Sequence, residues 1–185
     1  MTEWQRITWI FFHTLTLNYN DEYRDKYIEF FNTFKTIIPC KICRNHFNQN
    51  IGKDNMSIES NINSDRIFNW TIDLHNSVNK MNHKKIWNYE EAKKYYTENN
   101  FDNKILKFFV FEYIKANFKK GLDKTEQLFK MIRSLVYLHP NHKKRFVLID
   151  FKEKFELNKN TIRNWLLAFV LITNEVSKME AELSI

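Results

Sequence analysis

Glycine and proline are almost missing from this chain, which has two of each among 185 residues. Tight hairpin turns depend on these residues, so the chain has little material for connecting antiparallel strands. Apolar side chains instead recur at spacings of three and four, which is the repeat of an amphipathic helix. The sequence therefore predicts an all-α protein.

The apolar repeat predicts five helices in the first half of the chain. Asp21 and Ser64 are the expected N-caps of the second and fourth helices, and Pro39 suits the first turn of the third. A polar loop is expected from Gly52 to Asn63. The expected helices lie at about 2–18, 21–37, from about 39 onward, from 64 through 78, and, as a short fifth helix, 89–96.

The helical repeat resumes after a polar stretch at 97–100. Apolar residues from Ile105 to Tyr113 and from Leu128 to Leu135 indicate further helices, and the clearest repeat of all runs from Ile162 to Val170. We therefore expect two units. Residues 1–97 would form a four-helix bundle with a short fifth helix, and residues 98–185 a second small helical domain of unknown role.

The formal charge of +7 is concentrated in the second half, which carries 16 Lys and Arg against 11 Asp and Glu. These cations are spread out and form no dense block, so solvated helix faces explain them better than nucleic-acid binding. The N-terminus shows no secretory signal, and the most apolar stretch, 165–173, is too short to cross a bilayer. We expect an intracellular protein with no transmembrane segment.

The two cysteines, Cys40 and Cys43, are separated by only two residues. This spacing is typical of a redox pair or of half a metal site. A position at a helix N-terminus favours the reactive thiolate, because the helix dipole and free N–H groups stabilise negative charge. In such pairs the first cysteine is usually the more exposed, so Cys40 is expected to meet a substrate and Cys43 a cofactor.

Zinc binding is a close rival on spacing alone. Cys40, Cys43 and His46 form a C-x2-C-x2-H pattern, and a fourth ligand could come from His13, His75 or His83. A third interpretation is a basic nucleic-acid or scaffold protein whose function lies in residues 98–185.

Further motifs accompany the cysteines in a fixed order. The segment Trp9-Ile-Phe-Phe-His13 comes first, then Pro39-Cys-Lys-Ile-Cys-Arg-Asn-His46, and then His75-Asn-Ser-Val-Asn79. Together they resemble the Erv/ALR family of FAD-linked sulfhydryl oxidases, whose marks are W-x-x-L-H, P-C-x-x-C-x-x-H and H-N-x-V-N. The resemblance covers about residues 1–97. Phe12 stands where leucine is usual, and Gln5 where glycine often follows the first tryptophan.

The resemblance implies that the helical bundle binds FAD. Trp9 and His13 share a helix face, as do His75 and Asn79, so flat rings and polar edges could hold the isoalloxazine and adenine. Asn76 and Asn79 would bond polar edges, and Lys84 would lie near the pyrophosphate. The implied FAD-binding residues are Trp4, Trp9, His13, His46, Trp70, His75, Asn76, Asn79, Lys84 and Tyr96.

The same resemblance implies a reaction. A substrate dithiol would reduce the Cys40–Cys43 disulfide, and electrons would pass through FAD to oxygen, giving hydrogen peroxide. No other cysteine exists to act as an internal shuttle, so the substrate must reach Cys40 directly or be a thioredoxin-like partner protein. The family resemblance also implies a homodimer. A domain without shuttle cysteines joined to a helical extension is similar to the enzymes of large cytoplasmic DNA viruses, which would place the protein in host cytoplasm or virion.

Overall fold

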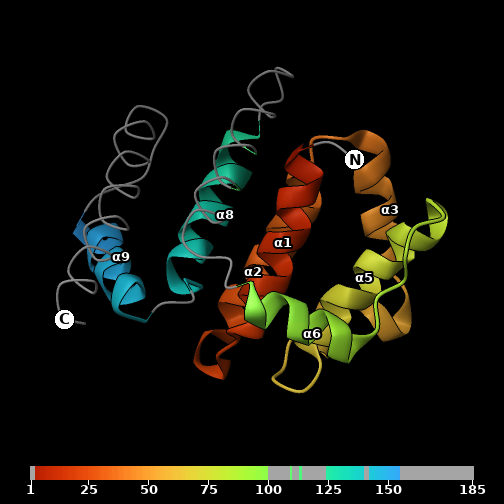
Figure 1. Cartoon of the computed structure of the whole chain (residues 1–185). Helices are drawn as coiled ribbons and strands as arrows, with labels where there is room; N and C mark the ends of the chain where they lie inside the picture. The colour runs from red at the N-terminus through yellow and green to blue at the C-terminus, as the bar shows by residue number, and fades with distance from the viewer. Residues whose placement is uncertain (1–2, 100–108, 110–112, 114–123, 140–141, 155–185) are drawn as a thin grey trace.

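The structure, a computed structural model, describes residues 3–99, 109, 113, 124–139 and 142–154 (Figure 1). Every regular element in these residues is a helix, which confirms the all-α class. The elements are α1 (Glu3–Leu17), η1 (Asp21–Tyr23), α2 (Arg24–Ile37), α3 (Lys41–Ile51), η2 (Asp54–Met56), α4 (Ile58–Asn61), α5 (Ile67–Met81), α6 (Tyr89–Glu98), α8 (Thr125–Tyr137) and α9 (His142–Lys154).

Local sequence explains where the second and third helices begin. The side chain of Asn20 caps the 3-10 turn η1, which leads directly into α2, so the cap is one residue earlier than the expected Asp21. Pro39 separates α2 from α3, because proline cannot donate the backbone hydrogen bond that a continuing helix needs. Cys40 then caps α3, whose first residue is Lys41.

The prediction of Ser64 as the N-cap of the fourth helix was wrong. The carbonyl of Asn63 accepts from the backbone N–H groups of Arg66 and Ile67, at 3.3 and 3.0 Å, so a backbone turn precedes α5 and no side chain caps it. The expected polar loop before it contains η2 and the short helix α4. Ile58 and Ile62 are buried there and anchor this segment to the core.

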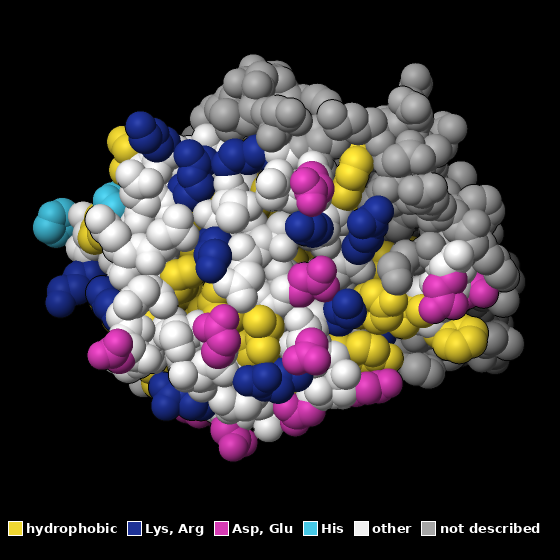
Figure 2. All heavy atoms as spheres, turned by 180° about the vertical axis from the view of Figure 1, so that it is seen from behind, with side chains coloured by type: hydrophobic (Ala, Val, Ile, Leu, Met, Phe, Trp, Pro, Cys, Tyr) yellow, Lys and Arg dark blue, Asp and Glu magenta, His cyan; other side chains and the backbone are white. Residues whose placement is uncertain are grey.

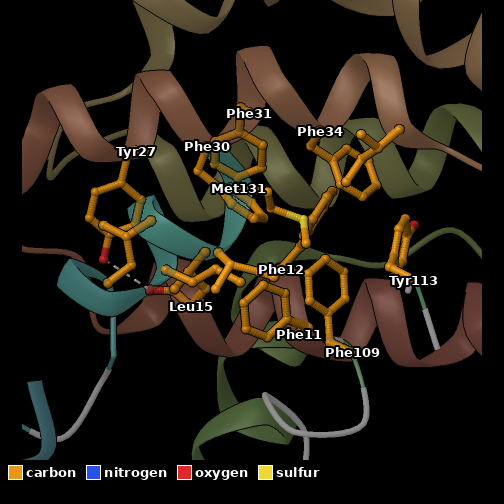
Figure 3. Packing of buried hydrophobic residues seen from close by; sticks show 14 of the residues in the cluster. Phe11, Phe12, Leu15, Tyr27, Phe30, Phe31, Phe34, Phe109, Tyr113 and Met131 are labelled. Atoms are coloured by element: carbon orange, nitrogen blue, oxygen red, sulfur yellow. Dashed lines mark hydrogen bonds between the residues drawn. The ribbon is translucent and has the colours of Figure 1, made fainter. Parts of the chain in front are cut away.

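Helices α1, α2, α3 and α5 form the bundle, and α6 packs across α1 and α5 as the short fifth helix (Figure 1). The interior between α1 and α2 is built from phenylalanine (Figure 3). The ring of Phe12 meets those of Phe31 and Phe34 edge to face, with centroids 5.1 and 4.7 Å apart. Such pairs contribute about 0.5–1.5 kcal/mol each beyond the burial of their area. This rigid interior fixes the faces of α1 that carry the candidate site.

Helix α8 lies along α2 and joins the same core. The apolar repeat predicted for this segment is confirmed, since Leu128, Met131, Ile132 and Leu135 are all buried. Phe109 and Tyr113 are fully buried in the same cluster. The described part of the second half therefore packs directly on the bundle, and its separation as a domain at residue 98 stays a prediction. The helix expected over 162–170 lies outside the described residues.

The surface carries both signs of charge. On the face shown in Figure 2, Lys and Arg side chains are spread out, with Asp and Glu side chains between many of them. Within the residues that the structure describes, no helix is long and apolar enough to cross a membrane.

Candidate active site

Cys40 and Cys43 are joined as a disulfide at the N-terminus of α3, with their Cα atoms 5.2 Å apart. The sulfur of Cys40 caps the helix and accepts from the backbone N–H of Cys43 at 3.2 Å. The placement of the pair on a helix N-terminus is as predicted. Negative charge that forms on Cys40 during reduction is therefore stabilised by the helix end.

The sulfur of Cys43 has a different neighbour. The side-chain amide of Gln5, on α1, donates to Cys43 Sγ over 3.6 Å. The sequence marked Gln5 only as a departure from the family pattern and gave it no role. The contact could have been suspected from its position between Trp4 and Trp9, since α1 presents all three to the same cavity.

A cavity of about 340 Å³ opens beside Cys43. Its size lies in the range of small-ligand pockets, which are mostly apolar with a few polar groups. Helices α1, α3 and α5 supply most of the wall. The structure brings six of the predicted site residues together in this lining: Trp4, Trp9, Cys43, His46, Asn79 and Lys84.

The ring of Trp9, which lines the cavity, is backed by histidine rings that do not line it. Trp9 and His75 stack with centroids 4.3 Å apart and planes inclined by only 3°. Behind them His13 is fully buried, and its Nε2 lies 3.0 Å from His75 Nδ1. The other nitrogen of His13, Nδ1, lies 3.1 Å from the hydroxyl of Thr71, so both ring nitrogens are fixed.

Both histidines are neutral at physiological pH. Burial lowers the pKa of His13 well below its usual value, and the neighbouring His75 lowers it further. Burial also lowers the pKa of His75 to about 4, with the positive charge of Lys84 adding to the effect. Neutral rings can share a single proton across the 3.0 Å contact, whereas two imidazolium ions would repel each other.

Asn79 and Lys84 form the polar part of the cavity wall. The amide nitrogen of Asn79 donates to the carbonyl of Lys85 at 2.9 Å, and its backbone carbonyl accepts from Lys84 N at 2.9 Å. These bonds fix the amide of Asn79 and the chain that carries Lys84. An exposed cation at the rim of an apolar pocket suits an anionic group of a ligand.

Five predicted ligand residues lie outside the cavity lining: His13, His75, Asn76, Trp70 and Tyr96. The amide of Asn76 forms two 2.9 Å bonds with the backbone of Trp87, so its polar atoms are satisfied within the protein. Trp70 is buried in the core and donates to the carbonyl of Met56. The ring of Tyr96 packs 4.7 Å from that of His13. Direct contact of these five with a ligand stays a prediction; in the structure they pack around the residues that line the cavity.

Thr8 and Tyr113 are among the cavity residues that sequence reasoning missed. Thr8 lies one helical turn after Trp4 on α1, so helical spacing could have found it. Tyr113 comes from the second half of the chain, and no sequence pattern connects it with the motifs.

The arrangement bears on the zinc alternative as well. A Cys-Cys-His site needs both cysteines as thiolates, whereas here they are joined as a disulfide. Across the described ranges, no three His, Cys, Asp or Glu side chains gather into a group that could hold a metal ion.

Comparisons with known proteins agree with one another. The model of the Erv1 / Alr family matches residues 6–98. A probable FAD-linked sulfhydryl oxidase of Acanthamoeba polyphaga mimivirus is 32% identical over 94 residues, which are 49% of this chain and 66% of that protein. No solved structure matches the chain at a comparable level of significance.

Two relatives come from African swine fever virus, and both are named FAD-linked sulfhydryl oxidase. The protein of a Kenyan pig isolate is 30% identical over 122 residues, covering 64% of this chain and 94% of the relative. That of a Malawian tick isolate is 29% identical over 102 residues, covering 53% and 83%.

Proposed function

Because the chain belongs to the Erv1/Alr family, we propose that it is an FAD-dependent sulfhydryl oxidase that forms disulfide bonds in substrate thiols. One observation carries the proposal. Cys43, half of a disulfide at a helix N-terminus, lines a cavity with flat aromatic walls. A cysteine pair needs such contact if its electrons are to pass to a planar cofactor.

The residues around the cavity fit the flavin. Trp4 and Trp9 offer ring faces to an isoalloxazine, the fixed amide of Asn79 can bond its polar edge, and Lys84 can meet a phosphate. When bound, FAD accepts two electrons from the reduced cysteine pair and passes them to oxygen, giving hydrogen peroxide.

The thiol step begins at Cys40. A substrate thiolate attacks Cys40 Sγ, the bond to Cys43 breaks, and Cys43 leaves as a thiolate beside the amide of Gln5. A second substrate thiol then attacks the substrate sulfur of the mixed disulfide and releases Cys40, which the end of α3 stabilises. The substrate thereby loses two electrons and two protons and becomes a disulfide.

The natural substrate is proposed to be a protein. Both residues between the cysteines are exposed, with Ile42 exposed over 67% of its surface, so a thioredoxin-like partner could reach Cys40. If the protein forms the expected homodimer, the interface must use a face other than the side of α2 that α8 covers. The viral relatives support an origin in a large DNA virus and a location in host cytoplasm or virion.

Thiol-driven oxygen consumption tests this function. We expect Cys43→Ser to abolish turnover while the bound flavin remains, and Cys40→Ser to block entry of substrate electrons. His83→Asn is the control, because His83 is exposed, has a φ of 52° that asparagine tolerates, and is not among the residues of the cavity wall. Full activity in either serine variant would refute the mechanism.

A further inference from the structure

Tyr113 connects the second half of the chain with the active site. The family match ends at residue 98, yet the side chain of Tyr113 lines the same cavity as Cys43. The side chain of Tyr113 is fully buried.

The hydroxyl of Tyr113 is tied to α1. It lies 2.9 Å from the hydroxyl of Thr8, which itself donates to the carbonyl of Trp4 at 2.7 Å. Since Thr8 uses its proton on that carbonyl, Tyr113 is the donor in the contact between the hydroxyls. Burial raises the pKa of Tyr113, so the phenol keeps this proton at physiological pH.

The ring of Tyr113 is held on both sides. Its centroid lies 4.6 Å from that of Phe109 and 5.4 Å from that of Phe34. Figure 3 labels these three residues near one another. On the cavity side it meets Trp4 edge to face at 6.0 Å and 88°. Phe109 stacks on Phe11 at 4.1 Å and does not itself line the cavity.

We propose that Tyr113 is a flavin-site residue that the C-terminal extension contributes. Its ring forms part of the cavity wall, and its hydroxyl, through Thr8, fixes the first turn of α1 where Trp4 and Gln5 face the cysteine pair. The part of the chain after residue 98 then completes the cofactor site through Tyr113 and covers α2 through α8. This inference rests on the proposed function, because the occupant of the cavity is taken to be FAD.

The dissociation constant of FAD from the full-length apoprotein tests this, measured by quenching of flavin fluorescence. Tyr113→Leu should weaken FAD binding about tenfold, since it removes the ring from the wall. Tyr113→Phe keeps the ring, loses the bond to Thr8, and should weaken binding about threefold. It also keeps the test valid if the leucine variant fails to fold.

A buried tyrosine elsewhere in the core serves as the matched control. Tyr27 is almost as buried as Tyr113 and belongs to the same core, but it does not line the cavity. Tyr27→Phe should lower stability but leave the dissociation constant unchanged. If wild type, Tyr113→Phe and Tyr113→Leu bind FAD with equal dissociation constants, the role of Tyr113 is refuted and the proposed function still stands. A wild-type protein that binds no FAD would overturn the proposed function with it.

Discussion

The two sulfur atoms of the active disulfide have unequal surroundings. Cys40 Sγ accepts from the first turn of α3, whereas Cys43 Sγ faces the cavity and the amide of Gln5. A sulfur that is better stabilised as a thiolate is the better leaving group. The bond from Gln5 therefore favours release of Cys43 in the first step, whereas the end of α3 favours release of Cys40 when the mixed disulfide is resolved.

Replacing Gln5 by leucine should disfavour the Cys43 thiolate. Removing a donor to a charged sulfur slows reduction of the disulfide by roughly tenfold or more. Gln49→Leu, at an exposed position on α3, is the control and should leave the rate of reduction unchanged. The ultraviolet absorbance of thiolate in the reduced apoprotein, followed against pH, measures this directly. A titration identical to that of wild type would contradict a role for Gln5.

The buried histidines predict a pH dependence of stability. The folded pKa of His75 is about 4 and that of His13 is also lowered, so the unfolded chain binds more protons below the ordinary value of 6.5. Their contribution is therefore complete above pH 6.5 and falls as the pH drops towards 4. We expect His75 to contribute a loss of about 2 kcal/mol between about pH 7 and 5.

Urea unfolding at several pH values checks this expectation. His75→Gln should make the pH dependence shallower over that window, and His83→Asn should leave it as in wild type. An unchanged slope in His75→Gln would mean that the pair does not control acid stability.

At the scale of elements, Asn76 joins α5 to the segment before α6. Both of its amide atoms bond the backbone of Trp87, and the enclosed segment carries Lys84. Asn76→Ala leaves the backbone N–H and carbonyl of Trp87 without these partners and should lower the free energy of unfolding by about 1–3 kcal/mol. It should also weaken FAD binding by releasing Lys84.

Asn63→Ala is a suitable comparison, because Asn63 makes a local side-chain bond to Ser60 O away from the cavity. Calorimetry and flavin titration of both variants separate the two effects. If Asn76→Ala binds FAD as tightly as wild type does, the position of the segment that carries Lys84 does not depend on the bonds between Asn76 and Trp87.

The elements also show what the sequence can predict. Long apolar repeats identified α1, α2, α5 and α8, because each buries a continuous stripe. The cap at Ser64 was wrong and α4 was missed, since a four-residue helix is set by the burial of Ile58 and Ile62 rather than by a repeat. The cysteine pair was placed correctly because Pro39 ends one helix and precedes the next.

At the scale of the whole molecule, α8 and the bundle share one core. Met131 on α8 is fully buried in this core (Figure 3), so Met131→Ala should cost about 2–5 kcal/mol through the cavity it leaves. Lys130→Ala removes only an exposed ion pair with Glu126 and should cost less than about 1 kcal/mol.

Denaturant unfolding followed by tryptophan fluorescence distinguishes a shared core from independent domains. A shared core predicts one transition that shifts as a whole in Met131→Ala. Two transitions, of which only one shifts, would instead favour a separate domain beginning near residue 98.

The sequence could not predict the part of the site that depends on how the whole chain packs. The family motifs end near residue 98, and the contact of Tyr113 with Thr8 joins residues 105 positions apart. Nothing in local spacing encodes such a contact, because it depends on how the extension packs over α1 and α2.

The visible absorption spectrum of the purified protein tests the central claim most directly. The protein should be yellow with bound flavin; anaerobic dithiothreitol should bleach it through Cys40 and Cys43, and air should restore the colour. A colourless protein that addition of FAD leaves unchanged would contradict the assignment of this chain as a sulfhydryl oxidase.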